Sequence, residues 1–450
     1  MEDKSDQEEL SKLPERLVDK AIKYSCYQFV LGAIASSLAG GMFITGFALK
    51  LGATNAQIGL MSTVPMYCVL LQLVTSSLVE RGISRRLFTT YLAIAWALVW
   101  ALIAALPYVM FKVGPGARIT TLIALITLAS AAAHLSTNSR SSWLADLIPS
   151  RRLGEFFGKS MLLSSLVGVV FGIIGGGFLD HLKRGGASAF AWIFLVGAAV
   201  GMVCALLNLP QADVPLRKHE HSHNTMKMVR EAFRNKSLML VIAFAVVWSL
   251  QAIASPFITV YILRDLRVPF VGLGIINAAS SVSVLLSSTF WGRMVDRYGC
   301  RPVMIACVLS LVPVPICWIW VTSAMSAYCI LMPVNLIAGF TGTGMSVALS
   351  KMLFNVTTET GKSVQLAVYS IMVYLFCAPM PAIGGHLPDW LRAIGIHADL
   401  RCTFYVVPIF TLSAALIANK IKEPNSRQTS EFVRNLPKHL TPSGLSGKTK

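Results

Sequence analysis

Charged residues are scarce in this chain. Only 13% of its 450 residues are Asp, Glu, Lys or Arg, whereas 55% are hydrophobic. A soluble domain usually carries about a quarter charged residues, and it could not hide this much apolar surface from water. One membrane-spanning helix needs roughly 20 apolar residues, and the sequence offers twelve such stretches. The composition therefore excludes an ordinary soluble protein and predicts a polytopic membrane protein.

Sequence patterns for disulfide, metal and catalytic chemistry are also missing. The nine cysteines form no C-x-x-C pair, and most lie in apolar stretches, which argues against a disulfide framework or a zinc site. No P-loop, nucleophile motif or pair of catalytic carboxylates is visible. We therefore expect no enzyme, no cofactor and no ATP-driven pump in this chain.

The central polar segment contains the run His219-Glu220-His221-Ser222-His223. Such a cluster can bind a metal ion, or it can be a solvated linker with adventitious affinity. Because no further ligands lie nearby in sequence, we interpret the run as a linker and predict no metal site.

The predicted fold is all-α, with twelve transmembrane helices in two six-helix halves. Five regions follow from the hydropathy pattern: a cytoplasmic N-terminal segment, an N-terminal bundle, a cytoplasmic linker, a C-terminal bundle and a cytoplasmic tail, at residues 1–24, 25–210, 211–238, 239–421 and 422–450. The predicted spans are residues 25–49, 56–79, 87–111, 119–145, 157–180, 187–209, 239–263, 268–292, 301–322, 326–353, 363–387 and 401–420.

Lys and Arg are distributed unevenly among the loops. With both termini in the cytoplasm, the cytoplasmic segments hold 29 of these residues and the opposite side holds nine. This bias predicts a multi-pass protein of the plasma or inner membrane with both termini cytoplasmic. It also accounts for the formal net charge of +18 without a nucleic-acid partner, since no basic stripe is interleaved with aromatics. We expect a monomer in the lipid bilayer.

The two halves of the sequence resemble each other. The tripeptide Phe-Ile-Thr that begins at Phe43 recurs at Phe257, Glu80-Arg81 matches Asp296-Arg297, and Gly-Gly-Phe-Leu-Asp from Gly176 matches the segment from Gly384. The offset between the copies stays between 208 and 216 residues. Two six-helix halves in parallel repeat are typical of a large class of transporters, in which the solute site lies between the halves near the bilayer midplane.

A charged loop follows the eighth predicted helix, from Gly292 to Arg301, and contains Asp296, Arg297 and Gly299. Glycine allows a tight turn, and Asp296 can accept a hydrogen bond from Arg301 or lie at a helix N-terminus, where the dipole favours anions. Such a charge cluster can latch two helices in one conformational state and release them in another. The spacing resembles the signature loop of the major facilitator superfamily, G-x-x-x-D-R-x-G-x-[RK].

This resemblance covers roughly residues 25–420. It implies a secondary transporter that moves a small solute by alternating access, with helices 1, 4, 7 and 10 lining the cavity. The substrate-path candidates are the polar residues of these helices, chiefly His134, Asn138, Arg140, Ser249, Gln251, Asn335 and Thr341, and also Ser36 and Ser37.

The first half carries a degenerate copy of the signature loop. Ser76 stands in place of the leading glycine, Glu80 replaces the aspartate, and Arg81 and Arg85 follow. This departure leaves the strength of an N-terminal latch open. The segment from Ser141 to Pro149, followed by Arg151, Arg152 and Gly154, resembles the loop between helices 4 and 5 in a branch of bacterial facilitators. Residues 355–361 are its weaker counterpart in the second half.

Glycines line the fifth and eleventh predicted helices. They resemble the helix-5 motif that the superfamily associates with exchangers and exporters, although Ile173 replaces its proline. Small residues also allow plain helix–helix packing, so export or exchange is only one of two interpretations. The glycines concerned are Gly168, Gly172, Gly176, Gly177, Gly384 and Gly385.

Arg140 is the one Lys or Arg well inside a predicted span, roughly 9 Å from the cytoplasmic end of helix 4. It either reaches toward Asp146 at the membrane rim or binds a carboxylate or phosphate in the cavity, which would make the substrate anionic. No acidic residue falls in the middle of a predicted span, so His134 is the remaining titratable candidate at depth. A membrane-embedded enzyme and a non-transporting sensor on a transporter scaffold remain alternatives to transport.

Overall fold

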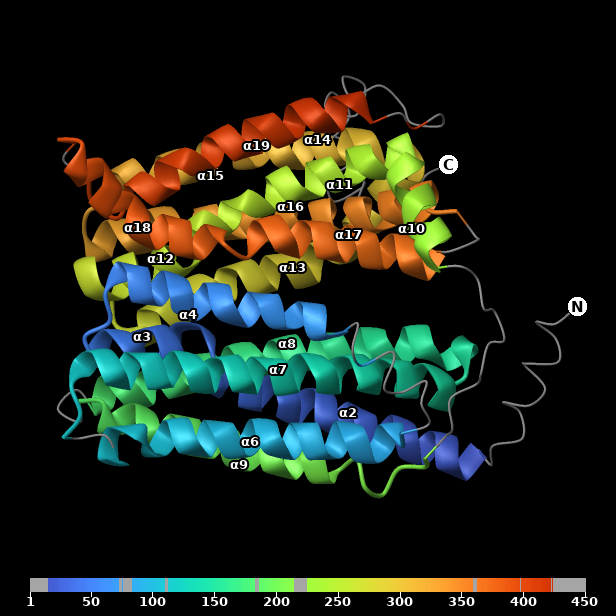
Figure 1. The fold of residues 1–450 in the computed structure, drawn as a ribbon, viewed down its shortest axis with the longest axis horizontal. Coiled ribbons are helices and arrows are strands. Elements are labelled where there is room, and N and C mark those ends of the chain that lie inside the picture. The colour runs from blue at the N-terminus through green and yellow to red at the C-terminus, as the bar shows by residue number, and fades with distance from the viewer. Residues whose placement is uncertain are drawn as a thin grey trace, which may run out of the picture. The chain divides into compact units, whose positions relative to one another are not determined.

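The computed structural model describes residues 15–72, 75, 83–109, 112–182, 186–213, 225–358, 362–396, 398–421 and 423. In this part of the chain the regular elements are all helices (Figure 1). Eleven of these helices are long and apolar enough to cross a membrane, and a shorter apolar helix covers Asn55–Leu71. The prediction of an all-α polytopic membrane protein is therefore confirmed.

The described chain separates into two compact units. Unit 1 comprises Met1–His221 and Pro269–Gly274, and unit 2 comprises Ser222–Val268 and Ile275–Lys450. The helices of unit 1 are α2 (Glu15–Ala39), α3 (Gly41–Lys50), α4 (Asn55–Tyr67), η1 (Cys68–Leu71), α6 (Arg85–Val109), α7 (Pro115–Leu147), α8 (Ser150–His181) and α9 (Ser188–Leu206).

Most of the remaining helices belong to unit 2. They are α10 (Thr225–Arg234), α11 (Lys236–Ser249), η2 (Leu250–Ile253), α12 (Ser255–Val260), η3 (Tyr261–Asp265), α13 (Phe270–Tyr298), α14 (Cys300–Leu311), α15 (Pro313–Ile316), η4 (Cys317–Trp320), α16 (Ala324–Val356), α17 (Lys362–Cys377), α18 (Met380–Ala393) and α19 (Cys402–Lys420). Only the first turn of α13 is assigned to unit 1.

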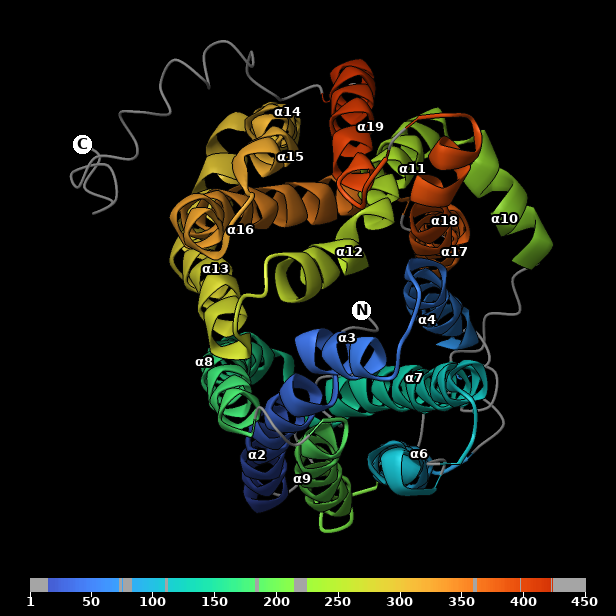
Figure 2. The same cartoon turned by 90° about the vertical axis from the view of Figure 1, so that its left-hand side faces the viewer.

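Helices pack along their length within each unit. In unit 1, α6 lies against α7 and α9, and α2 lies against α8 and α9 (Figure 2). The aromatic rings of Phe47 and Phe194 meet edge to face there, with centroids 5.3 Å apart. In unit 2, α14 packs against α16 and α19, and the buried Trp291 donates from Nε1 to the carbonyl of Phe340 at 2.6 Å.

Five predicted spans consist of two or more helical segments each. Gly41 adopts a φ of 54° where α2 passes into α3, a conformation that glycine tolerates best. Prolines stand in the first turn of α12, α15 and α18, where their missing N–H group interrupts the preceding helix. Such discontinuous helices are typical of transporters, in which they form solute sites.

Two predicted boundaries need correction. The segment from Ser141 is not a loop, because α7 continues to Leu147 and α8 begins at Ser150 after Pro149. The predicted linker at 211–238 contains α10, whose Ala232 is fully buried in the hydrophobic core of unit 2. His219, His221 and His223 lie outside the described residues, and the described part holds no cluster of His, Cys, Asp or Glu suited to a metal.

Candidate functional site

The signature loop of unit 2 makes an ion pair that the sequence did not predict. Asp296 Oδ1 accepts from Lys351 Nζ of α16 at 2.5 Å, and both side chains are exposed, Asp296 by 74% and Lys351 by 43%. The expected bond between Asp296 and Arg301 is therefore wrong: Lys351 lies within reach of the carboxylate, whereas Arg301 points toward α19. The loop thus joins α13 to α16 through a charged contact in solvent.

The start of α14 is held by the end of α19. Glu423 accepts from the backbone N–H groups of Cys300 and Arg301 at 3.1 and 2.9 Å, so Glu423 rather than Asp296 occupies the helix N-terminus. The Arg301 guanidinium donates to the carbonyl and the side chain of Asn419, both at 2.8 Å. Gly299 has a φ of 92°, which explains why this turn requires glycine.

The other residues of the signature loop make fewer contacts with neighbouring helices. The Arg297 guanidinium lies 5.7 Å from the ring centroid of the neighbouring Tyr298. A Cβ atom added at Gly292 would meet nothing within 4 Å, so packing does not demand glycine there. In unit 1 the matching Glu80 and Arg81 lie outside the described residues.

Arg85 forms an ion pair beside the signature loop of unit 1. Its Nη1 donates to Asp146 Oδ2 at 2.6 Å and to the backbone and side-chain oxygens of Ser142 at 3.1 Å. The Arg85 side chain is only 1% exposed, whereas that of Asp146 is 32% exposed. This pair therefore fastens the start of α6 to the end of α7 largely out of solvent.

Four substrate-path candidates of unit 2 donate side-chain hydrogen bonds to backbone carbonyls of the same span. Each donates to a backbone carbonyl three or four residues earlier, at distances between 2.7 and 3.0 Å. The amide oxygens of Gln251 and Asn335 accept from no donor among the described residues. The four residues are Ser249, Gln251, Asn335 and Thr341.

The polar residues of α7 face different helices of unit 1. Asn138 donates from Nδ2 to the carbonyl of Gln72 at 3.0 Å. Ser139 accepts from Thr89 of α6 at 3.0 Å. The Arg140 guanidinium lies 5.2 Å from the ring centroid of Phe29 on α2. Asn138 and Arg140 therefore serve different neighbours, in agreement with their spacing on the helix.

Arg140 has no hydrogen-bond or ion-pair partner among the described residues, and its Nη2 atom is buried. Asp146, the partner that the sequence suggested, is bound by Arg85 instead. The Phe29 ring beneath the guanidinium also packs edge-on against Phe156 at 5.7 Å. The guanidinium thus lies beside an aromatic cluster, and its buried Nη2 has no hydrogen-bond partner among the described residues.

Close helix contact accounts for several of the motif glycines. A Cβ atom at Gly176 would lie 2.9 Å from the backbone of Phe270 and Val271, and one at Gly172 would lie 3.3 Å from Ser37 Oγ. Added carbon at Gly384 would overlap the carbonyl of Ile253. By contrast, Gly168 faces open space and Gly177 only touches Val271 at 3.5 Å. Packing therefore explains Gly172, Gly176 and Gly384.

The sequence matches the family model described as Major Facilitator Superfamily over residues 26–266 and 240–446. The chain belongs to the major facilitator superfamily. This membership confirms the transporter-type architecture of two repeated halves that the signature loop and the internal repeat implied. A search of curated proteins finds no significant match.

Solved structures of transporters share the fold. A single-residue mutant of the nucleoside transporter NupG superposes with a TM-score of 0.71 at 13% identity, over 89% of this chain and 100% of that one. The xylose transporter XylE from E. coli gives 0.67 at 12% identity, over 93% and 99%. A bacterial homologue of the human lysosomal transporter Spinster gives 0.68 at 13% identity, over 92% and 99%. At these identities the likeness establishes the fold of a superfamily transporter.

Sequence reasoning missed three contacting residues. Lys351 and Glu423 stand far along the chain from the loop that they hold, so spacing alone could not pair them with it. Asp180, at the end of α8, accepts from the backbone N–H groups of Phe270 and Val271 at 3.0 and 2.9 Å. The internal repeat had marked Asp180 as a matched position, and that was the only signal for it.

Proposed function

We propose that the protein is a secondary transporter that carries a small anionic solute across the plasma or inner membrane by alternating access. Family membership and the fold support the general part of this proposal. The structural relatives NupG and XylE are a nucleoside transporter and a xylose transporter, so the solute of this chain must be argued from its own side chains.

Arg140 carries the anionic part of the proposal. A charge inside a membrane span costs about 2.5–3.5 kcal/mol on insertion scales, and a protein normally offsets it with a partner. Arg140 has no such partner among the described residues, and Asp146 is engaged by Arg85. The planar guanidinium beside Phe29 is well suited to bind a carboxylate or phosphate through two parallel hydrogen bonds.

Binding of small anions to the purified protein tests this assignment. We expect Arg140→Gln to lose at least tenfold in affinity for an anionic ligand found by screening, and Arg140→Lys to lose less because it keeps the charge but not the planar fork. Arg152→Gln is the matched control, since Arg152 pairs with Asp19 on an exposed surface. Equal binding by wild type and both Arg140 variants would make the residue structural.

Stability distinguishes the two roles of Arg140 independently of any ligand. Since the guanidinium has no partner among the described residues, its removal orphans no carboxylate in that part of the chain, and Arg140→Gln should unfold at the wild-type temperature or above it. A marked loss of stability would indicate a packing role for Arg140.

Uptake into proteoliposomes separates transport from the alternatives. A transporter accumulates or exchanges the anion, a sensor on the same scaffold only binds it, and a membrane-embedded enzyme converts it. The direction of transport is not assigned from the glycines of α8, because packing against Phe270 accounts for Gly176. His134 has no hydrogen bond among the described residues, and it is the titratable candidate at depth for proton coupling.

The proposed orientation places both termini in the cytoplasm. It rests on the excess of Lys and Arg in the corresponding loops. Reporter fusions after Lys50, Lys183 and Arg392 should report the non-cytoplasmic side, and fusions after Arg86 and Lys422 the cytoplasm. A periplasmic signal from the Arg86 fusion would refute the orientation.

A further inference from the structure

A cavity of about 500 Å³ lies where α18 turns into α19 in unit 2. This volume falls within the usual range of sites for small ligands, ~300–1,000 Å³. None of its lining residues belongs to the helices of the proposed solute path. The cavity is lined by Leu391, Arg392, Ile396, Ala398, Asp399, Arg401, Cys402 and Tyr405.

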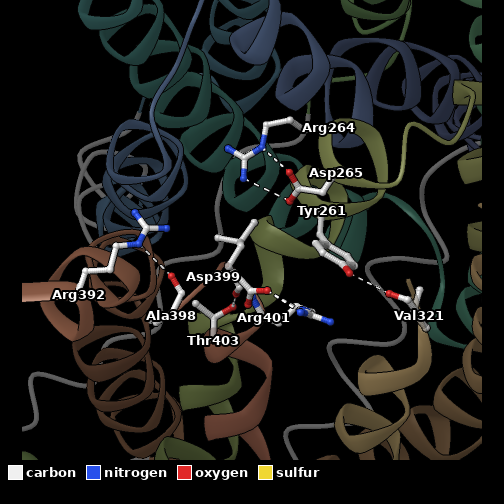
Figure 3. Close-up of polar contacts among 10 residues, drawn as sticks. Tyr261, Arg264, Asp265, Val321, Arg392, Ala398, Asp399, Arg401 and Thr403 are labelled. Atoms are coloured by element: carbon white, nitrogen blue, oxygen red, sulfur yellow. Dashed lines mark hydrogen bonds and ion pairs between the residues drawn. The ribbon is translucent and has the colours of Figure 1, made fainter. Parts of the chain in front are cut away.

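The lining combines two arginines with an apolar wall. Arg401 is held in place by Asp399, whose carboxylate accepts from its guanidinium at 2.7 and 2.8 Å and from its backbone N–H at 3.0 Å (Figure 3). The hydrogen bond to Asp399 raises the pKa of Arg401 above its usual value. This tight pair neutralises Asp399, so that Asp399 repels an incoming anion only weakly.

Arg392 is bound less tightly. Its Nε donates to the carbonyl of Ala398 at 3.0 Å, as Figure 3 shows, and its Nη1 reaches Asp389 only at 3.3 Å. The side chain is 56% exposed, and an exposed pair of this kind contributes little energy. The Arg392 guanidinium can therefore exchange Asp389 for another anion at small cost.

Large apolar side chains surround the same turn and point to lipid as the occupant. Trp390 is 54% exposed, Ile394 71%, Ile396 51% and Tyr405 43%, and all four stand at the junction of two membrane-spanning segments. Aromatic residues in such positions lie at the level of lipid headgroups, and arginines beside them reach toward phosphates. The apolar wall thus continues into a surface that faces the edge of the bilayer.

We propose that this cavity binds a phospholipid, with its phosphate on Arg392 and the start of an acyl chain along Leu391, Ile396 and Tyr405. The Arg392 guanidinium can bind the phosphate group of a lipid or a free phosphate ion. Only a lipid also contacts the apolar wall, so this wall selects the lipid. The proposal is independent of the transported solute, because the cavity lies apart from Arg140.

Lipid binding to the purified full-length protein tests the proposal, with native mass spectrometry as the readout and short-chain phosphatidylglycerol and inorganic phosphate as probes. We expect Arg392→Gln to bind the lipid about fivefold more weakly, since one basic residue at a membrane surface contributes on this scale. Arg264→Gln is the matched control, because Arg264 pairs with Asp265 outside the cavity.

A second variant separates lipid from phosphate. Ile396→Asn should weaken binding of phosphatidylglycerol while leaving any binding of inorganic phosphate unchanged. The proposal is overturned if Arg392→Gln binds the lipid as well as the control does, or if inorganic phosphate displaces the lipid at equal concentration. Because Ile396 and Arg392 are both exposed, neither change is expected to unfold the protein.

Discussion

Units 1 and 2 each form an ion pair beside the signature loop, but the two pairs join different helices. In unit 1 the cation Arg85 stands next to the loop and the anion Asp146 stands on α7. In unit 2 the loop supplies the anion Asp296, and α16 supplies the cation Lys351. The pair of unit 1 therefore joins α6 to α7, whereas the pair of unit 2 joins α13 to α16, so the repeat has not kept this contact on matching helices.

Two other contacts recur at corresponding places in both units, although different residues make them. The guanidinium of Arg86 donates to the carbonyls of Leu209 and Gln211, much as that of Arg301 donates to Asn419. Asp213 accepts from Ser84 at 2.6 Å just before α6, where unit 2 places Glu423 at the start of α14. The repeat thus preserves where the chain is fastened rather than the side chains that fasten it.

Burial is where the two ion pairs differ most. Arg85 is 1% exposed, whereas both partners of the pair in unit 2 are largely in solvent. A buried pair is costly to break, and an exposed pair is not. We infer that the contact of unit 1 is structural and that the contact of unit 2 is the one suited to open and close during a transport cycle.

The largest effect is expected for Arg85→Met. It leaves Asp146 without its cation, and we expect a loss of about 3 kcal/mol in the free energy of unfolding, the lower end for a broken buried pair, because Asp146 keeps contact with solvent. Lys351→Met should cost below about 1 kcal/mol as an exposed pair. Unfolding in detergent measures both, and equal stabilities would refute the distinction between the units.

A smaller effect, on transport rather than stability, is expected for Asp296→Asn. Loss of the contact with Lys351 should shift the balance of conformational states by about 1 kcal/mol, roughly a fivefold change in turnover, while the unfolding temperature stays near that of wild type. The exchange Asp296→Lys with Lys351→Asp keeps an ion pair between α13 and α16 and should restore turnover. Uptake assays decide this, and normal turnover in Asp296→Asn would argue against a latch.

A further effect, on stability alone, concerns the acidic residues that follow the sixth and twelfth spans. Glu423→Gln removes a negative charge from a helix N-terminus and should cost about 1 kcal/mol of stability. Asp213→Asn should cost less, because Asp213 accepts from the Ser84 hydroxyl. Thermal unfolding of the two variants side by side provides the comparison, and a larger loss for Asp213→Asn would reverse the proposed equivalence.

Local patterns in the sequence predicted the fold well. Apolar runs predicted the spans, because a segment in lipid must satisfy its own backbone hydrogen bonds and therefore forms a helix. The internal repeat predicted the two halves. The helix breaks at Gly41 and at the prolines were missed, since hydropathy averages over them. The boundary near Ser141 was placed too early because polar residues there continue α7 into the end of the span.

The candidate site was predictable only in part. The residue types of the loop and the isolation of Arg140 on its own helix face could be derived from spacing. The partners Lys351, Glu423 and Phe29 could not, because each lies on another helix whose rotation and height the sequence does not specify. For Asp296 the sequence offered Arg301 or a helix N-terminus, both near in sequence, yet tertiary packing places it against Lys351.

The bond from Asp180 to the start of α13 has a consequence for the order of assembly. The acceptor, Asp180, is synthesised about 90 residues before the donors Phe270 and Val271. Unit 1 nevertheless includes Pro269–Gly274, which follow the first segment of unit 2, Ser222–Val268. At synthesis rates of about 5–20 residues per second, the carboxylate of Asp180 waits several seconds in the membrane before Phe270 and Val271 arrive. An N-terminal fragment cut at the linker would lack this contact permanently, so the N-terminal bundle of this chain is completed only after the C-terminal half has begun to insert.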